Sequence, residues 1–181
     1  MAYITVNETG TFPTLLLSTF LGNGQVGNTF PNADGNLSSD TAVGNILNVT
    51  CLQDVTITNS TGIFSWTDFC SASINKVTTP SDNEISTNMV LDGEVFFGDV
   101  GANASSAKGY GVSGLSTNRI EVAFRVQMND DTVQADTPSG AFFYAGRGYI
   151  SSVAPTVSPD SPVWVSPLTL AVSGDMISGE G

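Results

Sequence analysis

The residues that most often carry out catalysis are missing from this sequence. Its 181 residues include no histidine and only two cysteines, Cys51 and Cys70. Histidine is the commonest general base and metal ligand, so neither a serine–histidine–acid triad nor a cysteine–histidine pair can form. Two cysteines without histidine are also too few ligands for a structural zinc site. The sequence therefore predicts a protein with no catalytic residue, metal or cofactor, and it disfavours a small hydrolase.

Two other patterns that can bind ions or phosphates are present only in incomplete form. Asp130 and Asp131 lie in a predicted turn, whereas a calcium loop needs acidic residues at alternate positions and a closing glutamate. The Gly-x-Gly pairs at 109–111 and 146–148 lack the following helix that would hold a phosphate. We expect the two acids to form a solvated corner, and the glycines to mark bulges or close approaches of the backbone.

The two cysteines are expected to be free. No cation precedes the short apolar run at 15–21 and no cleavage site follows it, so the sequence shows no secretory signal. Cytoplasm keeps thiols reduced, and a free cysteine is usually buried. We therefore expect Cys51 and Cys70 to be buried thiols, with a bridge between them as the alternative. No apolar stretch approaches the length of a membrane span, so no stable membrane insertion is expected.

Composition favours strands over helices. Apolar residues make up 40% of the chain, which is enough for a core, while charged residues make up only 12%. Glycine, serine, threonine and asparagine are abundant, and long helices would need more alanine, glutamate, lysine and arginine. The length allows one domain with a substantial core. We therefore predict a single, mainly β domain over residues 1–181.

The charge balance excludes tight binding to nucleic acid. Five lysines and arginines face seventeen acids, which gives a formal net charge of -12. A protein that grips phosphates needs a basic footprint, and none of the five cations is adjacent to another. An acidic surface can serve solubility, or it can line a conduit through which DNA slides without sticking. Composition alone leaves both explanations open.

The elements that position these residues are clearest in the last third of the chain. In 119–128, apolar and polar side chains alternate, which is typical of a half-buried strand with one apolar and one wet face. Strands are also predicted over 141–153 and 163–174, with prolines mainly in the connections. The three strands form an antiparallel meander. Pro167 lies inside the last strand and predicts an edge or a bulge there.

Upstream of the meander, the sequence predicts a mixed set of elements. Strands are expected over 2–6, 46–58 and 89–98, the last with a kink near Gly93, and 14–21 is an apolar segment that fits either strand or helix. Ser65 and Asp68 form a capping box, which predicts one short helix over 66–75. A turn is expected at 81–84. Residues 22–45 and 99–117 are rich in small and polar residues and are predicted to be long loops or arms.

Several of these segments resemble parts of phage major tail tube proteins. The first is Phe142-Phe143-Tyr144-Ala145-Gly146-Arg147-Gly148-Tyr149-Ile150-Ser151-Ser152-Val153-Ala154-Pro155. The second is the terminal strand, which ends Leu168-Thr169-Leu170-Ala171-Val172-Ser173-Gly174. Upstream, Val77-Thr78-Thr79-Pro80 and Leu91-Asp92-Gly93-Glu94-Val95-Phe96-Phe97 resemble the family's threonine-bearing loop and its Asp-Gly-Glu-Val strand. The resemblance covers residues 74–174, and residues 20–45 match nothing in the family.

This resemblance implies a fold, an assembly and a set of partners. The fold is an antiparallel β-sandwich or distorted β-barrel with one short flanking α-helix. Six copies form a ring, and rings stack into a hollow tube that carries genomic DNA into the host without specific binding. The tube forms around a tape-measure protein and is completed by tail terminator and baseplate proteins. The protein would be part of the virion, in the phage tail, and would assemble in the cytoplasm of the host bacterium.

Within this reading, two sets of residues are candidates for function. Aromatic side chains on both faces of the strands exceed what a one-sided sheet can bury, so some are expected between subunits. The interface candidates are Phe30, Phe96, Phe97, Tyr110, Phe143 and Trp164. Acidic residues are expected to repel the DNA backbone from the wall of the channel. The lumen-facing candidates are Asp92, Glu94, Asp99 and Glu121.

Two other functions remain open on the sequence. The chain could be another virion β protein, namely a head decoration, neck or tail terminator protein. It could also be a carbohydrate-binding β-sandwich in which Trp66, Trp164 and exposed tyrosines stack on sugar rings. Self-assembly separates a tube subunit from a carbohydrate-binding protein, because only the former forms hollow filaments or rings.

Overall fold

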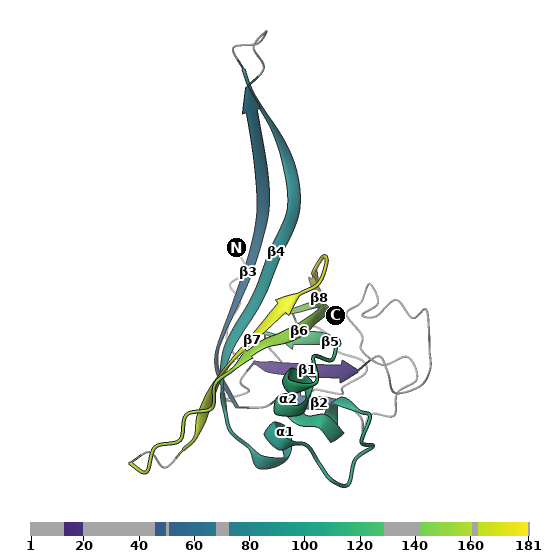
Figure 1. The fold of residues 1–181 in the computed structure, drawn as a ribbon, viewed down its shortest axis with the longest axis vertical. Helices are drawn as coiled ribbons and strands as arrows, with labels where there is room; N and C mark the ends of the chain where they lie inside the picture. Colours follow the sequence, from purple (N-terminus) through teal and green to yellow (C-terminus); the bar gives the residue numbers. More distant parts are fainter. Residues whose placement is uncertain are drawn as a thin grey trace.

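The described part of the chain is mainly β, as the sequence predicts. The computed structural model describes residues 13–19, 46–49, 51–67, 73–128, 142–160 and 163–180. Within these ranges eight strands and two short helices are present (Figure 1). In chain order they are β1 (Thr14–Thr19), β2 (Leu47–Val49), β3 (Leu52–Thr67), β4 (Ile74–Val90), α1 (Gly93–Phe97), α2 (Ala107–Thr117), β5 (Val122–Gln127), β6 (Phe142–Val153), β7 (Val165–Val172) and β8 (Ile177–Glu180).

All described strands join one antiparallel sheet. Its order is β2-β1-β5-β6-β7-β4-β3, and β8 pairs with the first part of β6. The predicted meander is confirmed, because β5 pairs with β6 and β6 pairs with β7. The strand predicted over 46–58 is divided into β2 and β3 around Cys51, whose φ is 59°. The predictions for 2–6, 22–45, Asp68, Cys70 and Asp130–Asp131 fall outside the described residues.

The prediction for Pro167 is wrong in one respect, because β7 is an interior strand. Pro167 lies opposite Asn88 of β4, and its carbonyl accepts a hydrogen bond from the Ala154 N–H at 3.3 Å. In an antiparallel strand, the N–H and C=O of a residue point to the same neighbour. The donor that proline lacks would therefore face Ala154, one residue beyond the end of β6, where few ladder bonds are lost.

The predicted positions of helix and turn are also wrong. Residues 66–67 end β3, Ile74 begins β4, and Trp66 lies opposite Asn75, so the described ends of the predicted 66–75 helix are strand. The turn expected at 81–84 is part of β4. The register shift between Thr61 and Ile63 lies across from this region and accommodates Pro80. Residues 66–67, 74–75 and 81–84 instead belong to the two paired strands of one long hairpin.

Helices occur instead where a strand and a loop were expected. Asp92 caps α1, and its Oδ1 accepts from the N–H groups of Glu94 and Val95 at 2.9 and 3.1 Å. Ser106 caps α2, and its Oγ accepts from the Gly109 N–H at 3.0 Å. Helix α2 consists of two short helical segments joined by a kink at Gly111, whose φ of 63° is not helical, and its three glycines give it a poor helix propensity. Burial of Ala107, Val112 and Leu115 in the core stabilises it instead.

One hydrophobic core joins the helices to the sheet. Buried side chains from β1, β2, β5 and β7 pack with Phe96 of α1 and with Val112 and Leu115 of α2. Residues 14–19 of the apolar segment at 14–21 form strand β1, in which Leu15 and Leu17 belong to this core and Leu16 is buried in a small second cluster with Ile46 and Ala123. The predicted wet face of β5 is wrong, because Arg125 and Gln127 are 2% and 3% exposed. The Arg125 guanidinium lies 4.3 Å from the centre of the Phe143 ring, and burial lowers the pKa of Arg125.

The glycines at 109–111 mark a close approach of backbones, as expected. Gly98 and Gly111 have φ values of 99° and 63°. A Cβ at Gly98 would collide with the backbone of Gly109, and a Cβ at Gly111 would collide with the backbone of Gly98. This contact holds the end of α1 against the middle of α2. A side chain at either position would add left-handed strain to a backbone collision.

We expect Gly111→Ala to lower the free energy of unfolding by about 2–4 kcal/mol, because strain and overpacking combine. Gly93→Ala is the matched control. It lies in α1 with open space around its Cα, so it should be neutral or stabilise by up to about 1 kcal/mol. Urea unfolding followed by circular dichroism measures both. Equal stability of the two variants would contradict the proposed backbone contact.

Candidate assembly interface

The most distinctive feature of the molecule is a long β-hairpin that leaves the body. Strands β3 and β4 pair from Leu52↔Met89 to Thr67↔Ile74, but β7 pairs with β4 only over Glu84–Val90. The outer half of the hairpin therefore projects from the sheet, as Figure 1 shows. We call residues 63–67 and 74–78 the hairpin arm. In this arm both strand edges lack a partner among the described strands.

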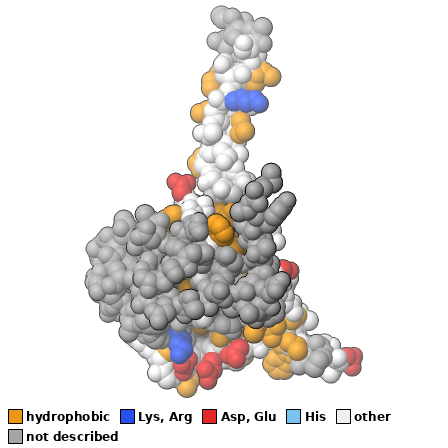
Figure 2. All heavy atoms as spheres, turned by 180° about the vertical axis from the view of Figure 1, so that it is seen from behind, with side chains coloured by type: hydrophobic (Ala, Val, Ile, Leu, Met, Phe, Trp, Pro, Cys, Tyr) orange, Lys and Arg blue, Asp and Glu red, His pale blue; other side chains and the backbone are white. Residues whose placement is uncertain are grey.

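The hairpin arm carries large apolar side chains in solvent. Phe64 and Trp66 are 57% and 44% exposed, and their rings stack at 5.9 Å between centres. Val77 lies opposite Phe64 and therefore shares this face, whereas Ile63 and Ile74 lie on the other face. Figure 2 shows apolar side chains along the hairpin. Contiguous exposed apolar surface marks an interaction site, and it carries no evident benefit on an isolated molecule.

Charge on the hairpin arm is limited to one cation. Lys76 is the only lysine or arginine between residues 51 and 90, and it is exposed. It lies opposite Ser65, on the face of Ile63 and Ile74. Strand β3 forms the edge of the sheet and has one charged side chain, Asp54, in 16 residues. Edge strands on monomers are usually protected by charges, so this edge is poorly protected against pairing.

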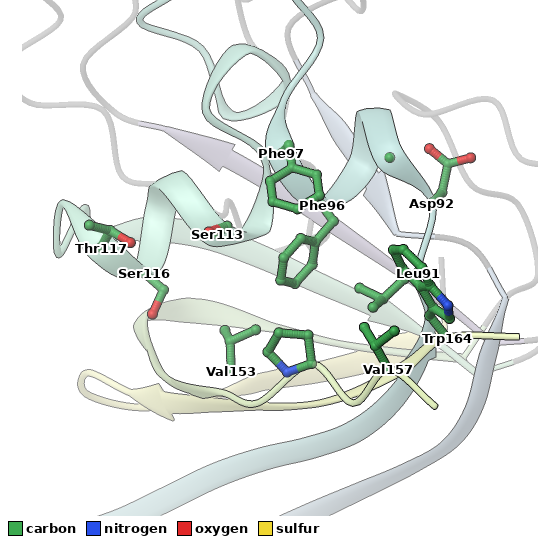
Figure 3. Close-up of a pocket in the computed structure, with 12 residues that line it drawn as sticks. Leu91, Asp92, Phe96, Phe97, Ser113, Ser116, Thr117, Val153, Val157 and Trp164 are labelled. Carbon is green, nitrogen blue, oxygen red and sulfur yellow. The ribbon is translucent and has the colours of Figure 1, made fainter. Parts of the chain in front are cut away.

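Helices α1 and α2 lie at the opposite end of the molecule from the hairpin arm (Figure 1), and a groove lies beside them (Figure 3). Its volume is about 540 Å³. One wall comes from the segment of α1 and from α2, and the other comes from the end of β6 and the loop before β7 (Figure 3). Its lining residues are Leu91, Asp92, Gly93, Phe96, Phe97, Ser113, Ser116, Thr117, Val153, Pro155, Val157 and Trp164. The lining is mostly apolar, with one carboxylate.

The α1 side of the groove is acidic. Asp92 and Glu94 are both exposed, and Asp99 follows directly after α1. The Gly101 N–H, 2.7 Å from Asp99 Oδ1, and the Lys108 ammonium, 3.1 Å from Oδ2, hold the pKa of Asp99 below its usual value. Lys108 is thereby occupied by Asp99. Asp92 lines the groove, and Glu94 is exposed two residues further along the chain, in α1.

The lowered pKa of Asp99 predicts a pH dependence. A carboxyl group with a depressed folded pKa stabilises the fold above its unfolded pKa, and this stabilisation is lost as pH falls through the folded pKa. Asp99→Asn should therefore be slightly less stable than the wild type at pH 7, and the difference should shrink as pH falls below the ordinary range of aspartate. Thermal unfolding between pH 7 and pH 3 measures this. A difference that is constant over the range would exclude titration of Asp99 as its cause.

The structure separates the predicted interface residues into two groups. Phe96 and Phe143 are buried in the chain's own interior, and Tyr110 is half-buried against the core. Phe97 and Trp164 are 71% and 50% exposed, and both line the groove. They come from segments distant in sequence and share one surface. Phe30 lies outside the described residues.

Three of the four acids predicted to face a lumen lie in or next to α1. Asp92 caps α1, Glu94 lies in its first turn, and Asp99 is paired with Lys108. Glu121 precedes β5 and is half-buried. Which of them faces a channel stays a prediction. Cys51 is exposed with a free thiol, so the prediction that it is buried is wrong.

Comparison with solved structures finds similar chains, and two of them come from gene transfer agent particles. No family model matches the sequence, and no curated protein matches it. A chain of the virion of a native gene transfer agent particle is 13% identical with a TM-score of 0.46, over 74% of this chain and 88% of that one. A chain from the tail of an empty gene transfer agent particle with C6 symmetry is also 13% identical, with a TM-score of 0.48, over 75% and 89%. At these values neither similarity assigns a function to this chain.

Neither a cluster of metal-ligating side chains nor a membrane-spanning helix is present among the described residues. No group of three metal-ligating side chains comes together in the ranges given above. Among the same residues, no helix is long and apolar enough to cross a membrane. Trp66 lies on the hairpin arm and Trp164 lies in the groove, so the two tryptophans do not form one platform for a sugar.

Sequence reasoning missed the hairpin arm. The capping box at Ser65 and Asp68 predicts a helix over 66–75, and the resemblance places Val77 in a loop, whereas the structure places both segments in the hairpin. A signal was present, because residues 52–67 contain repeated threonines, isoleucines and aromatic residues that favour strands. The length of the paired segment could not be seen from one strand alone, because it depends on a partner that follows the turn.

Proposed function

We propose that this chain is a structural virion protein, the major tail tube subunit of a phage-like particle, and that it is not an enzyme. The observation that carries this proposal is the hairpin arm, with its stacked Phe64 and Trp66 in solvent. On a monomer, a long apolar hairpin with two unpaired edges promotes aggregation. On a subunit of an assembly, the same hairpin can form the contact with a neighbouring copy. In this function, copies form six-membered rings that stack into a hollow tube.

Three further features support the proposal. Segments between residues 74 and 174 resemble the tail tube family, as described above. The 16-residue edge of β3 has a single charged side chain and is open to pairing with another copy. The net charge of -12 would repel the DNA backbone and keep the wall of the tube from binding it.

The proposed partners follow from the same function. A tape-measure protein sets the length of the tube, and terminator and baseplate proteins complete its ends. Genomic DNA passes through the lumen without specific contacts. The protein is a component of the virion tail and assembles in the host cytoplasm. A head decoration, neck or terminator protein of similar fold is the alternative, and such a protein would form a closed ring or bind a preformed shell instead of a filament.

Electron microscopy of the concentrated, purified protein in negative stain tests the proposal. We expect hollow filaments or stacked rings of uniform diameter. Single closed rings that never stack would favour a terminator or neck protein. A monomer at every concentration would contradict both, and tryptophan fluorescence that is quenched by added oligosaccharide would then favour the carbohydrate-binding function.

A further inference from the structure

We propose that the hairpin arm of one subunit docks in the Trp164 groove of a second copy, a contact that rests on the proposed tube function. Both surfaces are apolar, exposed and unexplained by the fold of a single chain. They lie at opposite ends of the molecule's longest axis (Figure 1). A surface at one end that fits a different surface at the other end makes a head-to-tail contact, and such a contact repeats without closing.

The side chains of the two surfaces match in kind. The face of the arm with Phe64, Trp66 and Val77 presents aromatic and aliphatic area. The wall of the groove made by Val153, Pro155, Val157 and Trp164 presents the same (Figure 3). Aromatic side chains dominate the energy of protein interfaces when a pocket desolvates them. The stacked pair on the arm is therefore the anchor of the contact.

The charges match as well. Lys76 is exposed on the second face of the arm, and within the described residues no ion pair occupies it. The α1 wall of the groove carries Asp92, and Glu94 is exposed beside it. When Phe64 and Trp66 face the wall formed by the β6–β7 loop, the opposite face of the arm with Lys76 faces α1.

The second copy explains the groove better than a small ligand does. Ligand pockets combine an apolar lining with several convergent polar groups that set orientation. This groove has one carboxylate, which already caps α1, and the three hydroxyl side chains of Ser113, Ser116 and Thr117 on a single wall. An extended arm with apolar side chains and one cation satisfies this lining without further polar partners.

The test uses two variants of the full-length chain that each damage one surface. Val157→Asp puts a charge into the groove at a residue that is 57% exposed, and Phe64→Thr with Trp66→Thr removes the anchor from the arm. Val100→Asp is the matched control, because Val100 is fully exposed and does not line the groove. We expect the control to assemble like the wild type and each damaged variant to lose stacking in sedimentation velocity.

Mixing the two damaged variants gives the decisive result. One keeps an intact arm and the other keeps an intact groove, so a mixture should form a complex of limited size, while each variant alone does not. If Val157→Asp stacks like the wild type, the inference is overturned while the tube function stands. The same holds if the mixture is no more associated than each variant alone. A wild type that never assembles would overturn the tube function itself.

A charge exchange tests the orientation of the arm. Lys76→Glu and Glu94→Lys should each raise the concentration needed for stacking about tenfold, and the double variant should return most of that loss. Both side chains are exposed, so the fold should be unaffected. Effects that simply add in the double variant would show that the two residues do not face each other.

Discussion

Replacing both Phe64 and Trp66 by threonine should abolish assembly and leave the fold of the subunit intact. Residues that anchor an interface typically cost 2 kcal/mol or more when truncated, so the concentration needed for assembly should rise at least about 30-fold. Threonine is chosen because it keeps the preference for strand at both positions. The two side chains are half exposed on a projecting hairpin, so the free energy of unfolding should change by less than about 1 kcal/mol.

Sedimentation velocity and negative-stain microscopy measure assembly in this experiment, and urea unfolding measures stability. Val100→Thr is the control, because it replaces an exposed apolar side chain away from the hairpin by one of similar shape. Assembly of the double variant at the wild-type concentration would mean that subunits associate without the hairpin arm. A large loss of stability would mean that the aromatic pair belongs to the subunit's own fold.

The hairpin illustrates why part of this fold escapes sequence reasoning. Trp66, Cys70 and Ile74 are spaced by four residues, which fits one face of a helix and fits equally two arms of a hairpin that reverse between them. Local spacing cannot separate these two cases. Pairing between Trp66 and Asn75 decides the structure, and it depends on contacts along the whole length of β3 and β4.

The two helices show a different limit. Gly109, Gly111 and Gly114 lie inside α2, and any reading based on helix propensity assigns this segment to a loop. The helix forms because Val112 and Leu115 are buried, and because glycine allows the backbones of α1 and α2 to meet. For α1, the sequence Glu94-Val95-Phe96-Phe97 favours a strand, and only the capping carboxylate of Asp92 indicates a helix start.

The last third of the chain was predictable for a physical reason. Its strands are consecutive and separated by proline- and glycine-rich connections, so most of the information that predicts them is local. The candidate interface residues were harder to assign from the sequence. A strand with aromatic residues on both faces has the same sequence pattern whether its own chain or another copy covers those residues. Phe143 lies under Arg125 in the interior, whereas Trp164 lies in the groove.

The contact between Phe124 and Gly146 is expected to contribute strongly to the stability of the subunit. Phe124 is fully buried in β5, and Gly146 lies directly opposite in β6. A Cβ at Gly146 would lie 2.9 Å from Phe124 Cζ, so the ring covers the glycine backbone of the neighbouring strand. Phe124→Ala should cost about 3–5 kcal/mol, equivalent to a fall in Tm of roughly 6–20 °C for a chain of this size.

Gly146→Ala should cost about 1–3 kcal/mol for the opposite reason, because the added methyl group meets the ring. If the ring of Phe124 and the added methyl group compete for the same space, a smaller residue at 124 should relieve the clash between them. Phe124→Leu with Gly146→Ala should then be more stable than the sum of the single variants predicts, by at least about 0.5 kcal/mol in urea unfolding. Phe97→Ala, an exposed phenylalanine, should cost less than about 1 kcal/mol and serves as the control. Strict additivity would show that Gly146 is retained for its backbone alone, and that the ring of Phe124 stabilises the sheet through its other neighbours in the core.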